Sequence, residues 1–355
     1  MPVFHPLVVR EVRRETDDTV SIAFDVPGDL ADAYAFVPGQ HLTIRMHGPD
    51  GDEVRRSYSI CSAPHEGELR VAVKHLPGGV FGAYAYQRLK PGEALDVMTP
   101  AGRFTTRLDP ANAKHYLGVA AGSGITPVVS LLKAILEVEP ASRFTLVYGN
   151  RGIASIIFRD ELDDLKNRFL GRLHVIHLFS REAQEVPLLN GRLSGDKLRE
   201  LARALIDVAG VDDAFVCGPE PMTLEVRDAL VELGVDPRHV HMELFGTVSP
   251  MRAPSPTGAD QGPRRHLTIV LNGVKTDVEM TASQSVLQAG EAAGLELPFS
   301  CRAGVCSTCR AKVCDGAVTM DRNYALEPWE VEAGFVLTCQ SHPTTDSLTV
   351  DYDAT

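Results

Sequence analysis

Four cysteines near the end of the chain carry the strongest chemical signal in the sequence. Cys301, Cys306 and Cys309 lie in the run Cys-Arg-Ala-Gly-Val-Cys-Ser-Thr-Cys, and Cys339 follows after a long gap. The spacing C-x4-C-x2-C with a distant fourth cysteine is typical of a plant-type [2Fe–2S] cluster held by four thiolates. Gly304 lets the backbone of this loop approach the sulfides closely. A structural zinc site is the alternative, but this loop does not match the paired spacing of zinc ribbons.

Composition excludes several classes of partner. The net charge is −12, from 35 basic and 47 acidic residues, which argues against binding to nucleic acid or to an anionic membrane. Residues 265–355 hold 12 acidic and 6 basic residues, so this quarter of the chain carries half of the net charge. That charge either steers a basic partner or is an ordinary solvated surface.

The remaining cysteines indicate a reducing compartment. Cys61, Cys217 and Cys314 are left over, and there is neither a signal peptide nor a run of about 20 apolar residues that would span a membrane. An odd number of cysteines outside the cluster motif, in a chain of this kind, predicts reduced thiols and a cytoplasmic protein. Cys314 follows strand-like alternation, so we interpret it as a packed or spare thiol and not as a cluster ligand.

Residues 1–110 predict a small antiparallel β-barrel. Short runs of alternating residues are separated by turn signals such as Pro38-Gly39 and Pro91-Gly92. The expected strands are 7–9, 20–24, 41–44, 58–60, 69–73 and 95–97.

Residues 111–246 change to alternating strands and helices, which predicts a parallel, doubly wound α/β sheet. Residues 247–264 hold four prolines without periodicity and predict a linker. Residues 265–355 begin with a hairpin over 266–271 and 276–280, turning at Asn272-Gly273, and continue with a helix over 285–293. The strands expected in the middle part are 116–121, 144–148, 173–177 and 213–217, and the helices are 127–137, 158–167, 196–206 and 222–233.

The barrel contains two candidate flavin-binding stretches. In the first, Arg56 can pair with a pyrophosphate, Tyr58 offers a flat face to an isoalloxazine ring, and Ser59 can hydrogen-bond near the redox nitrogen. Surface charge and ordinary barrel packing are the alternatives. In the second stretch the backbone can approach phosphates. Its candidate residues are Val73, Lys74, Gly79, Val80 and Phe81.

A glycine-rich turn lies between the first strand and the first helix of the α/β part. It reads Gly-Ser-Gly-Ile-Thr-Pro, a G-x-G-x-x-P pattern that departs from the G-x-G-x-x-G fingerprint. A helix that starts there presents free N–H groups to a pyrophosphate, although a mere tight turn is the alternative. The candidate residues are Gly122, Ser123, Gly124, Thr126 and Pro127.

Further candidates follow other strands of the sheet, at the carboxyl edge where open α/β sheets bind ligands. Cys217, Gly218 and Pro219 end the fourth strand, where a buried thiol before a turn is the alternative. Two arginines at the same edge suit a 2′-phosphate, and surface charge is equally compatible with them. These arginines and their neighbour are Arg151, Ser180 and Arg181.

Taken together, these parts resemble the ferredoxin-NADP reductase superfamily with a fused C-terminal plant-type ferredoxin. The resemblance covers essentially the whole chain and is most specific to the reductase subunits of phenylacetyl-CoA 1,2-epoxidase systems. The stretches that carry it are 36–42, 55–61, 120–127, 148–151, 323–328 and 334–340.

The resemblance implies a β-grasp ferredoxin domain, FAD on the barrel and a nicotinamide nucleotide at residues 122–127. It places Tyr58, Ser59 and Cys217 at the hydride-transfer site and the aromatic ring of Phe245 near the flavin. The arginines resemble the family's 2′-phosphate readers, so we expect NADPH in preference to NADH. Gly82 departs from the family, which usually has Ser or Thr there, and this puts one contact to the flavin phosphates in doubt.

The function implied is an electron-transfer chain from NAD(P)H through FAD and [2Fe–2S] to a di-iron oxygenase of phenylacetate breakdown. The implied partners are the oxygenase subunits of a multicomponent epoxidase. One alternative is the reductase of another oxygenase, of Rieske or di-iron type. The other is a redox carrier without NAD(P)H oxidoreductase activity.

Overall fold

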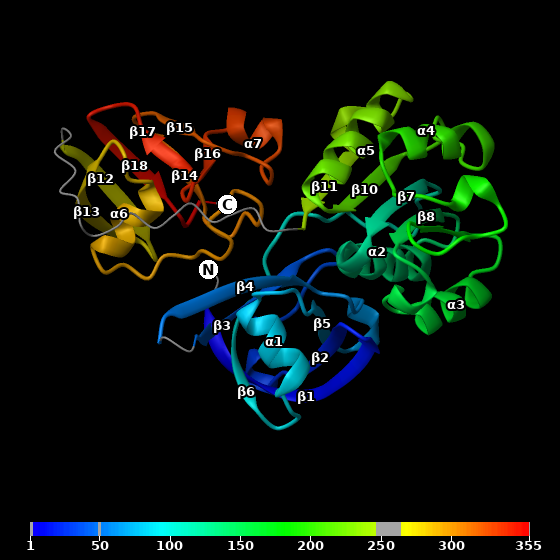
Figure 1. Cartoon of the computed structure of the whole chain (residues 1–355). Coiled ribbons are helices and arrows are strands. Elements are labelled where there is room, and N and C mark those ends of the chain that lie inside the picture. Colours follow the sequence, from blue (N-terminus) through cyan, green and yellow to red (C-terminus); the bar gives the residue numbers. More distant parts are fainter. Residues whose placement is uncertain (1–2, 49–50, 246–263, 355) are drawn as a thin grey trace. The chain divides into compact units, whose positions relative to one another are not determined.

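The computed structural model describes residues 3–48, 51–245 and 264–354 (Figure 1). Two compact units make up the chain. Among the described residues, the larger unit holds residues 4–54 and 58–245, and the smaller holds residues 3, 55–57 and 264–354. The predicted linker, 247–264, lies outside the described residues except for Arg264, which begins a strand. The predicted domain boundaries stay predictions.

The first sheet of the larger unit is the expected antiparallel barrel. Its strand order is β4-β3-β6-β1-β2-β5. Beyond the end of β4, Ile60 pairs with Val71 of β5 and the N–H of Cys61 donates to the Arg70 carbonyl at 2.9 Å, which joins the two edge strands. The six strands are β1 (Phe4–Thr16), β2 (Thr19–Asp25), β3 (His41–His47), β4 (Glu53–Ser59), β5 (Leu69–Lys74) and β6 (Ala94–Met98).

The barrel also contains a helix that we did not predict, α1 (Val80–Gln87). The run Gly78-Gly79 hid it because glycines favour turns, whereas Gly79 is in fact the residue before its first turn. Gly82, where the family usually has Ser or Thr, lies in α1. A Cβ there would lie 3.2 Å from the Lys74 carbonyl oxygen, so a larger residue requires a small shift between α1 and the end of β5.

The second sheet is parallel throughout, with the order β11-β10-β7-β8-β9. The chain therefore starts in the middle at β7, runs outward through β8 and β9, and then returns to β10 on the other side. This reversal is the topological switch point of a doubly wound sheet. The strands are β7 (His115–Ala121), β8 (Arg143–Asn150), β9 (Leu173–Phe179), β10 (Asp213–Gly218) and the unpredicted β11 (Val240–Leu244).

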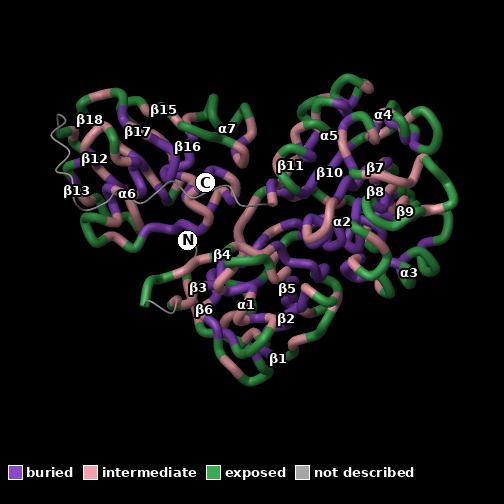
Figure 2. The backbone as a smooth tube through the Cα atoms, in the orientation of Figure 1, coloured by how far each residue is buried: buried purple, intermediate pink, exposed green. Residues whose placement is uncertain are grey.

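Helices cover both faces of this sheet. Those of one face share a core with Phe144 and Phe215, and those of the other share a core with Leu117 and Val216. Figure 2 shows β7, β8, β10 and α2 as mostly buried. The first face carries α2 (Ile125–Val138) and α3 (Arg159–Arg168), and the second carries α4 (Gly195–Ala204) and α5 (Glu220–Glu232).

The smaller unit is the expected α+β domain. Its mixed sheet has the order β13-β12-β18-β14-β16, and β15 pairs with β17 separately. Asn272 and Gly273 have φ angles of 54° and 72°, as the predicted hairpin turn requires. The elements are β12 (Arg264–Leu271), β13 (Val274–Thr281), α6 (Val286–Ala292), β14 (Arg310–Asp315), β15 (Val318–Met320), α7 (Pro328–Glu332), β16 (Phe335–Leu337), β17 (Ser341–Pro343) and β18 (Ser347–Asp351).

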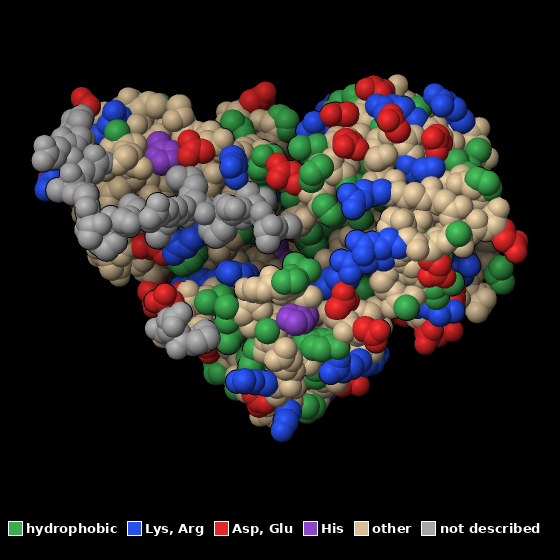
Figure 3. Space-filling view, in the orientation of Figure 1, with side chains coloured by type: hydrophobic (Ala, Val, Ile, Leu, Met, Phe, Trp, Pro, Cys, Tyr) green, Lys and Arg blue, Asp and Glu red, His purple; other side chains and the backbone are tan. Residues whose placement is uncertain are grey.

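Short 3-10 turns complete the described chain, at Gly28–Leu30, Pro64–Glu66, Gly122–Gly124, Ile153–Ser155, Pro187–Leu189 and Pro237–His239. No helix within the described residues is long and apolar enough to cross a membrane. On the face shown in Figure 3, acidic and basic side chains are interspersed over α4 and α5. Arg199 of α4 forms ion pairs with Asp196 and with Glu232 of α5.

Candidate functional site

The glycine-rich turn and the end of β10 meet at the switch point of the parallel sheet. A Cβ on Gly124 would lie 2.2 Å from the Cys217 carbonyl oxygen, so the turn packs directly on the backbone of the neighbouring strand. The Tyr148 hydroxyl donates to the Gly122 carbonyl at 3.0 Å, and the Thr126 hydroxyl donates to the Ser123 carbonyl at 3.0 Å. These contacts fix the loop that the sequence pattern predicted.

The start of this turn suits an anionic group. No side chain caps the turn at Gly122–Gly124 or the beginning of α2, and the N–H of Ile125 donates to the Gly122 and Ser123 carbonyls. The N–H groups of the turn itself are therefore the ones that would meet a ligand. Gly122 has a φ of 54°, and a Cβ there would meet nothing within 4 Å. Open space beside uncapped N–H groups at the start of a 14-residue helix fits the pyrophosphate of a dinucleotide.

Ser59 and Cys217 lie near a carboxylate that we did not assign to the site. The Ser59 hydroxyl donates to Glu243 Oε2 at 2.9 Å. Cys217 is fully buried, and burial together with the charge of Glu243 raises the pKa of its thiol well above the usual range. Glu243 begins the stretch Glu-Leu-Phe, which resembles the family's E-x-F motif, but we linked only its aromatic residue, Phe245, to the flavin. The position of Glu243 in the site follows from strand pairing: β11 lies parallel to β10, and Glu243 is the partner of Cys217.

Phe245 follows β11 directly. Its N–H donates to the Gly218 carbonyl at 2.7 Å, and its half-buried ring packs against the core that contains Cys217. On the barrel side, the ring of Tyr58 lies 5.3 Å from that of Phe81, at an angle of 40°. Phe81 is buried in the barrel core, so it supports the half-buried ring of Tyr58.

The other barrel candidates divide into backbone and side-chain roles. Val73 is fully buried, so only its backbone can reach a cofactor. Lys74 lies 3.0 Å from Asp18, and this ion pair occupies its ammonium group. Arg56 is exposed and donates to the Arg55 carbonyl at 2.8 Å. The N–H groups at Val80 have no side-chain cap and fit a phosphate at the start of α1.

The two candidate arginines stand on neighbouring loops at the carboxyl edge of the sheet. The N–H of Arg181 donates to the Arg151 carbonyl at 2.9 Å, and the N–H of Ser180 donates to the Asn150 carbonyl at 3.0 Å. Both arginine residues are exposed. Two arginines held on adjacent loops by backbone hydrogen bonds are a suitable geometry for a phosphate.

The four predicted cluster ligands form two pairs in the smaller unit. Cys301 hydrogen-bonds with Cys306, and Cys309 hydrogen-bonds with Cys339. Within the described residues, no three His, Cys, Asp or Glu side chains converge on one metal ion. Two pairs of thiols are the arrangement in which each iron of a two-iron cluster takes two thiolates.

The backbone around these thiols stabilises negative charge on sulfur. The N–H of Ala303 points at Cys301 Sγ at 3.3 Å, and the N–H of Cys301 points at Cys306 Sγ at 3.5 Å. The hydrogen bond from Cys306 lowers the pKa of Cys301 to about 7. Gly304 has a φ of 78° and would bring a Cβ to 3.0 Å from the Arg322 carbonyl oxygen, which confirms that this loop needs glycine.

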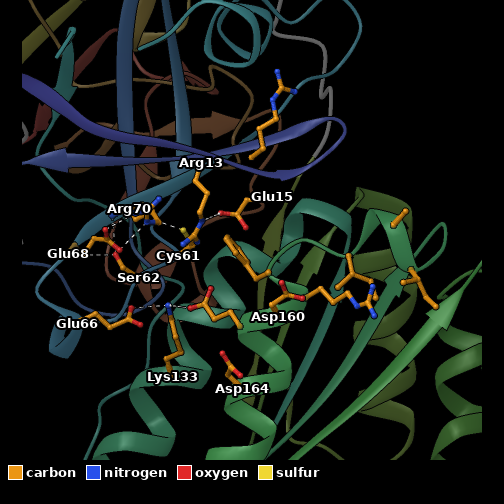
Figure 4. A pocket seen from close by; sticks show the side chains of 17 residues that line it. Arg13, Glu15, Cys61, Ser62, Glu66, Glu68, Arg70, Lys133, Asp160 and Asp164 are labelled. Atoms are coloured by element: carbon orange, nitrogen blue, oxygen red, sulfur yellow. Dashed lines mark hydrogen bonds and ion pairs between the residues drawn. The ribbon is translucent and has the colours of Figure 1, made fainter. Parts of the chain in front are cut away.

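A cavity of about 650 Å³ lies elsewhere in the larger unit, between β1, the segment after β4, and helices α2 and α3 (Figure 4). Charged side chains dominate its lining, and neither Ser59 nor Cys217 contributes to it. It is therefore separate from the site at the switch point.

A closed barrel, a doubly wound sheet with an open phosphate-binding turn, and paired cluster thiols define a reductase with FAD-binding, NAD-binding and [2Fe–2S] domains. Comparison with family models agrees. Residues 6–106 match an oxidoreductase FAD-binding domain, residues 119–228 an oxidoreductase NAD-binding domain, and residues 269–344 a 2Fe-2S iron-sulfur cluster binding domain.

Whole-chain relatives narrow the class. The chain is 42% identical over 355 residues to a component of the 1,2-phenylacetyl-CoA epoxidase of Escherichia coli, covering 100% of this chain and 99% of the relative. It is 34% identical to the ferredoxin reductase component of 3-ketosteroid-9-alpha-monooxygenase of Rhodococcus rhodochrous, covering 98% and 96%. The chain belongs to the family of oxygenase reductase components that includes this epoxidase component. The fold is that of phthalate dioxygenase reductase, with a TM-score of 0.55, 23% identity and 98% of each chain covered.

Proposed function

We propose that the protein takes hydride from NADPH on its FAD and delivers single electrons through the [2Fe–2S] cluster to the oxygenase of a phenylacetyl-CoA 1,2-epoxidase. The observation that carries the hydride site is the convergence of Ser59, Cys217 and Glu243 beside the phosphate-binding turn. The cofactors supply the redox chemistry, and the protein supplies position, electrostatics and exclusion of water.

The residues at the switch point have separate tasks in this proposal. The uncapped N–H groups at Gly122–Gly124 bind the pyrophosphate and thereby place the nicotinamide end near Cys217. The Glu243 carboxylate provides a fixed negative charge where the nicotinamide becomes positive as hydride leaves. The buried thiol of Cys217 stays protonated and fills space without charge.

The arginine pair supports the choice of NADPH. Arg151 and Arg181 lie at the carboxyl edge of β8 and β9, where the adenosine end of a nucleotide bound across the sheet would carry its 2′-phosphate. An arginine pairs with phosphate through several N–H groups, so this site favours the phosphorylated nucleotide.

The choice of oxygenase follows from the relative with the higher identity, and the steroid monooxygenase reductase supports a second candidate, a Rieske-type steroid oxygenase. Residues 323–328 are the stretch of sequence by which we distinguish an epoxidase reductase from a steroid monooxygenase reductase. They adjoin the cluster loop, since the N–H of Tyr324 donates to the Gly304 carbonyl at 3.0 Å. We also propose a cytoplasmic location, supported by the absence of disulfides among the seven cysteines.

An anaerobic titration tests the electron path. NADPH should bleach the flavin absorbance and then produce the electron paramagnetic resonance signal of a reduced cluster, and NADH should do so at higher concentration. Cys306→Ser should leave flavin reduction intact and abolish onward transfer. A flavin band that NADPH does not bleach would identify a redox carrier without oxidoreductase activity.

A second assay tests the partner. The reduced protein is mixed with phenylacetyl-CoA epoxidase oxygenase subunits or, separately, with a 3-ketosteroid 9α-monooxygenase oxygenase, each with its substrate. We expect product only from the first mixture. Product from the steroid oxygenase alone would reject our choice of partner.

A further inference from the structure

Helix α2 carries a buried cation at its centre. Lys133 is only 5% exposed on a helix whose other side chains are mostly apolar and buried. Its ammonium group lies 2.8 Å from Glu66 Oε2 and 2.8 Å from Glu161 Oε1. Glu66 ends the barrel turn Pro64–Glu66, whereas Glu161 belongs to α3 of the sheet domain. Figure 4 shows Lys133 directed from α2 toward Glu66.

A second contact lies one helical turn earlier. The hydroxyl of Ser130 donates to the Ser62 carbonyl at 2.7 Å, and both serine side chains are buried. The barrel segment that follows β4 is thus tied to α2 at two successive turns, once through a neutral hydrogen bond and once through an ion pair.

Beside these contacts the barrel also packs on α2, since Cys61 shares a buried hydrophobic core with Ile125 and Val129. The 650 Å³ cavity begins there too, and Lys133, Glu66 and Glu161 form part of its wall. Where the polar cavity separates the two parts, the ion pair joins the Glu66 end of the barrel segment to the helix. Charged residues elsewhere on its wall include Arg13, Arg14, Glu68, Arg159, Asp160 and Asp164.

Both connected segments lead directly to the hydride site. Ser62 lies three residues beyond Ser59, or about 10 Å along an extended chain. Ser130 lies about 7.5 Å and Lys133 about 12 Å along the helix from Ile125, where α2 leaves the phosphate-binding turn. A shift of α2 against the Ser62–Glu66 segment would therefore move the nucleotide relative to Ser59.

We propose that Lys133 is a positioning residue, which sets the distance between the nucleotide turn and the flavin strand by bridging α2 to Glu66. Lys133 acts only through these segments. The proposal rests on the proposed function for its kinetic consequence, whereas the coupling of barrel to helix is a property of the chain without cofactors.

The two carboxylates on Lys133 provide a matched pair of variants. Glu66→Gln removes the charge that crosses from barrel to sheet domain and keeps an acceptor for the Ala63 N–H. Glu161→Gln removes the charge within the sheet domain. Both carboxylates lie 2.8 Å from the same ammonium group, and both side chains are 31% exposed. A purely structural role predicts equal effects of the two substitutions.

The kinetic measurement is single-turnover flavin reduction by NADPH in the holoprotein. We expect Glu66→Gln to slow hydride transfer about tenfold, because a misplacement of about 1 Å can cost up to ~100-fold. Glu161→Gln should keep the rate within about twofold, because the contact between Lys133 and Glu66 remains and the reacting groups do not move. Equal rates for the two variants, or a larger loss in Glu161→Gln, would overturn the proposal.

A second measurement does not depend on activity. Hydrogen exchange of the cofactor-free protein should be faster over residues 60–66 and 125–130 in Glu66→Gln than in Glu161→Gln, with similar melting temperatures. Unchanged exchange in Glu66→Gln contradicts the coupling. If exchange changes as expected but NADPH reduces no flavin even in the wild type, the proposed function fails and the coupling stands.

Discussion

The Ser59 hydroxyl and the Glu243 carboxylate, 2.9 Å apart, join the last residue of barrel strand β4 to strand β11 of the parallel sheet. These residues are separated by 184 positions in the sequence. The hydrogen bond brings the strand that carries the flavin candidates to the strand beside Cys217. A flavin and a nicotinamide would meet at this junction.

Replacing Glu243 tests the electrostatic part of the site. Glu243→Gln keeps an oxygen that accepts from Ser59 but removes the negative charge. We expect flavin reduction by NADPH to slow on the order of 10- to 100-fold, since preorganised charge near a developing cation is worth a few kcal/mol. Stopped-flow absorbance under anaerobic conditions measures this rate. Glu232→Gln, on the exposed end of α5, is the control, and an equal rate in both variants would refute the assignment.

Gly124→Ala tests the close packing of the nucleotide turn. Gly124 has an ordinary φ of −62°, so alanine is conformationally acceptable, but its Cβ would lie 2.2 Å from the Cys217 carbonyl oxygen. The turn must therefore move, and the KM for NADPH should rise at least about tenfold, as one lost charge-assisted contact of roughly 1.5–3 kcal/mol implies. Gly28→Ala, where a Cβ meets nothing within 4 Å, should leave the KM unchanged.

The arginine pair predicts a change in nucleotide preference. Arg181→Ala and Arg151→Ala should each raise the KM for NADPH by about 10- to 100-fold, from the loss of roughly 1.5–3 kcal/mol per charged contact. The KM for NADH should stay the same because that nucleotide has no 2′-phosphate. Steady-state kinetics with both nucleotides measures the ratio. Arg168→Ala, an exposed arginine paired with Glu137 on α2, controls for net charge. A parallel rise for both nucleotides would argue against a 2′-phosphate contact.

A buried acid at the opposite edge of the sheet predicts a pH dependence of stability. Burial would raise the pKa of Asp213, but hydrogen bonds with His241, Lys114 and His239 hold it well below the usual range. An acid with a lowered pKa stabilises the fold above its unfolded pKa of about 3.9, and this contribution is lost as the pH falls below that value. Asp213→Asn should therefore cost roughly 3 kcal/mol at neutral pH.

Urea unfolding followed by circular dichroism checks this prediction. The difference between wild type and Asp213→Asn should shrink as the pH is lowered below about 4, because Asp213 of the unfolded wild-type chain then takes up a proton while the folded-state acid, with its lowered pKa, stays ionised. Asp228→Asn, in an exposed pair with Arg227, is the control and should show little difference at any pH. A constant difference across this range would contradict the predicted linkage.

Local sequence patterns predicted the architecture well. Six barrel strands, four of the five parallel strands and the Asn272-Gly273 hairpin appear where alternation and turn residues indicated them. Helix boundaries differed by a few residues. We expected α2 to begin at Pro127, because proline favours the first turn, whereas the helix begins two residues earlier at Ile125. Helix α1 was missed because its glycines favoured a loop.

Features that depend on distant segments were harder to predict. Nothing near Glu243 reveals that it lies beside Ser59, since β11 is short and only its pairing with β10 places it there. Likewise, Lys133 reads as an exposed helical lysine until the barrel is packed against α2. The cysteine spacing was informative because three of the four ligands are local, so the chemistry is visible before any tertiary contact is known.

The smaller unit has a hydrophobic core of its own, and every residue of that core, from Leu267 to Tyr352, comes from the C-terminal part of the chain. Replacing this unit as a whole would therefore leave the hydrophobic cores of the larger unit unchanged. A recombination event between the codons for Gly246 and Pro263 would exchange the electron's destination. The residues proposed to bind the flavin and the nucleotide, all upstream of that point, would be inherited intact, so the same hydride-transfer site would be joined to a different cluster domain.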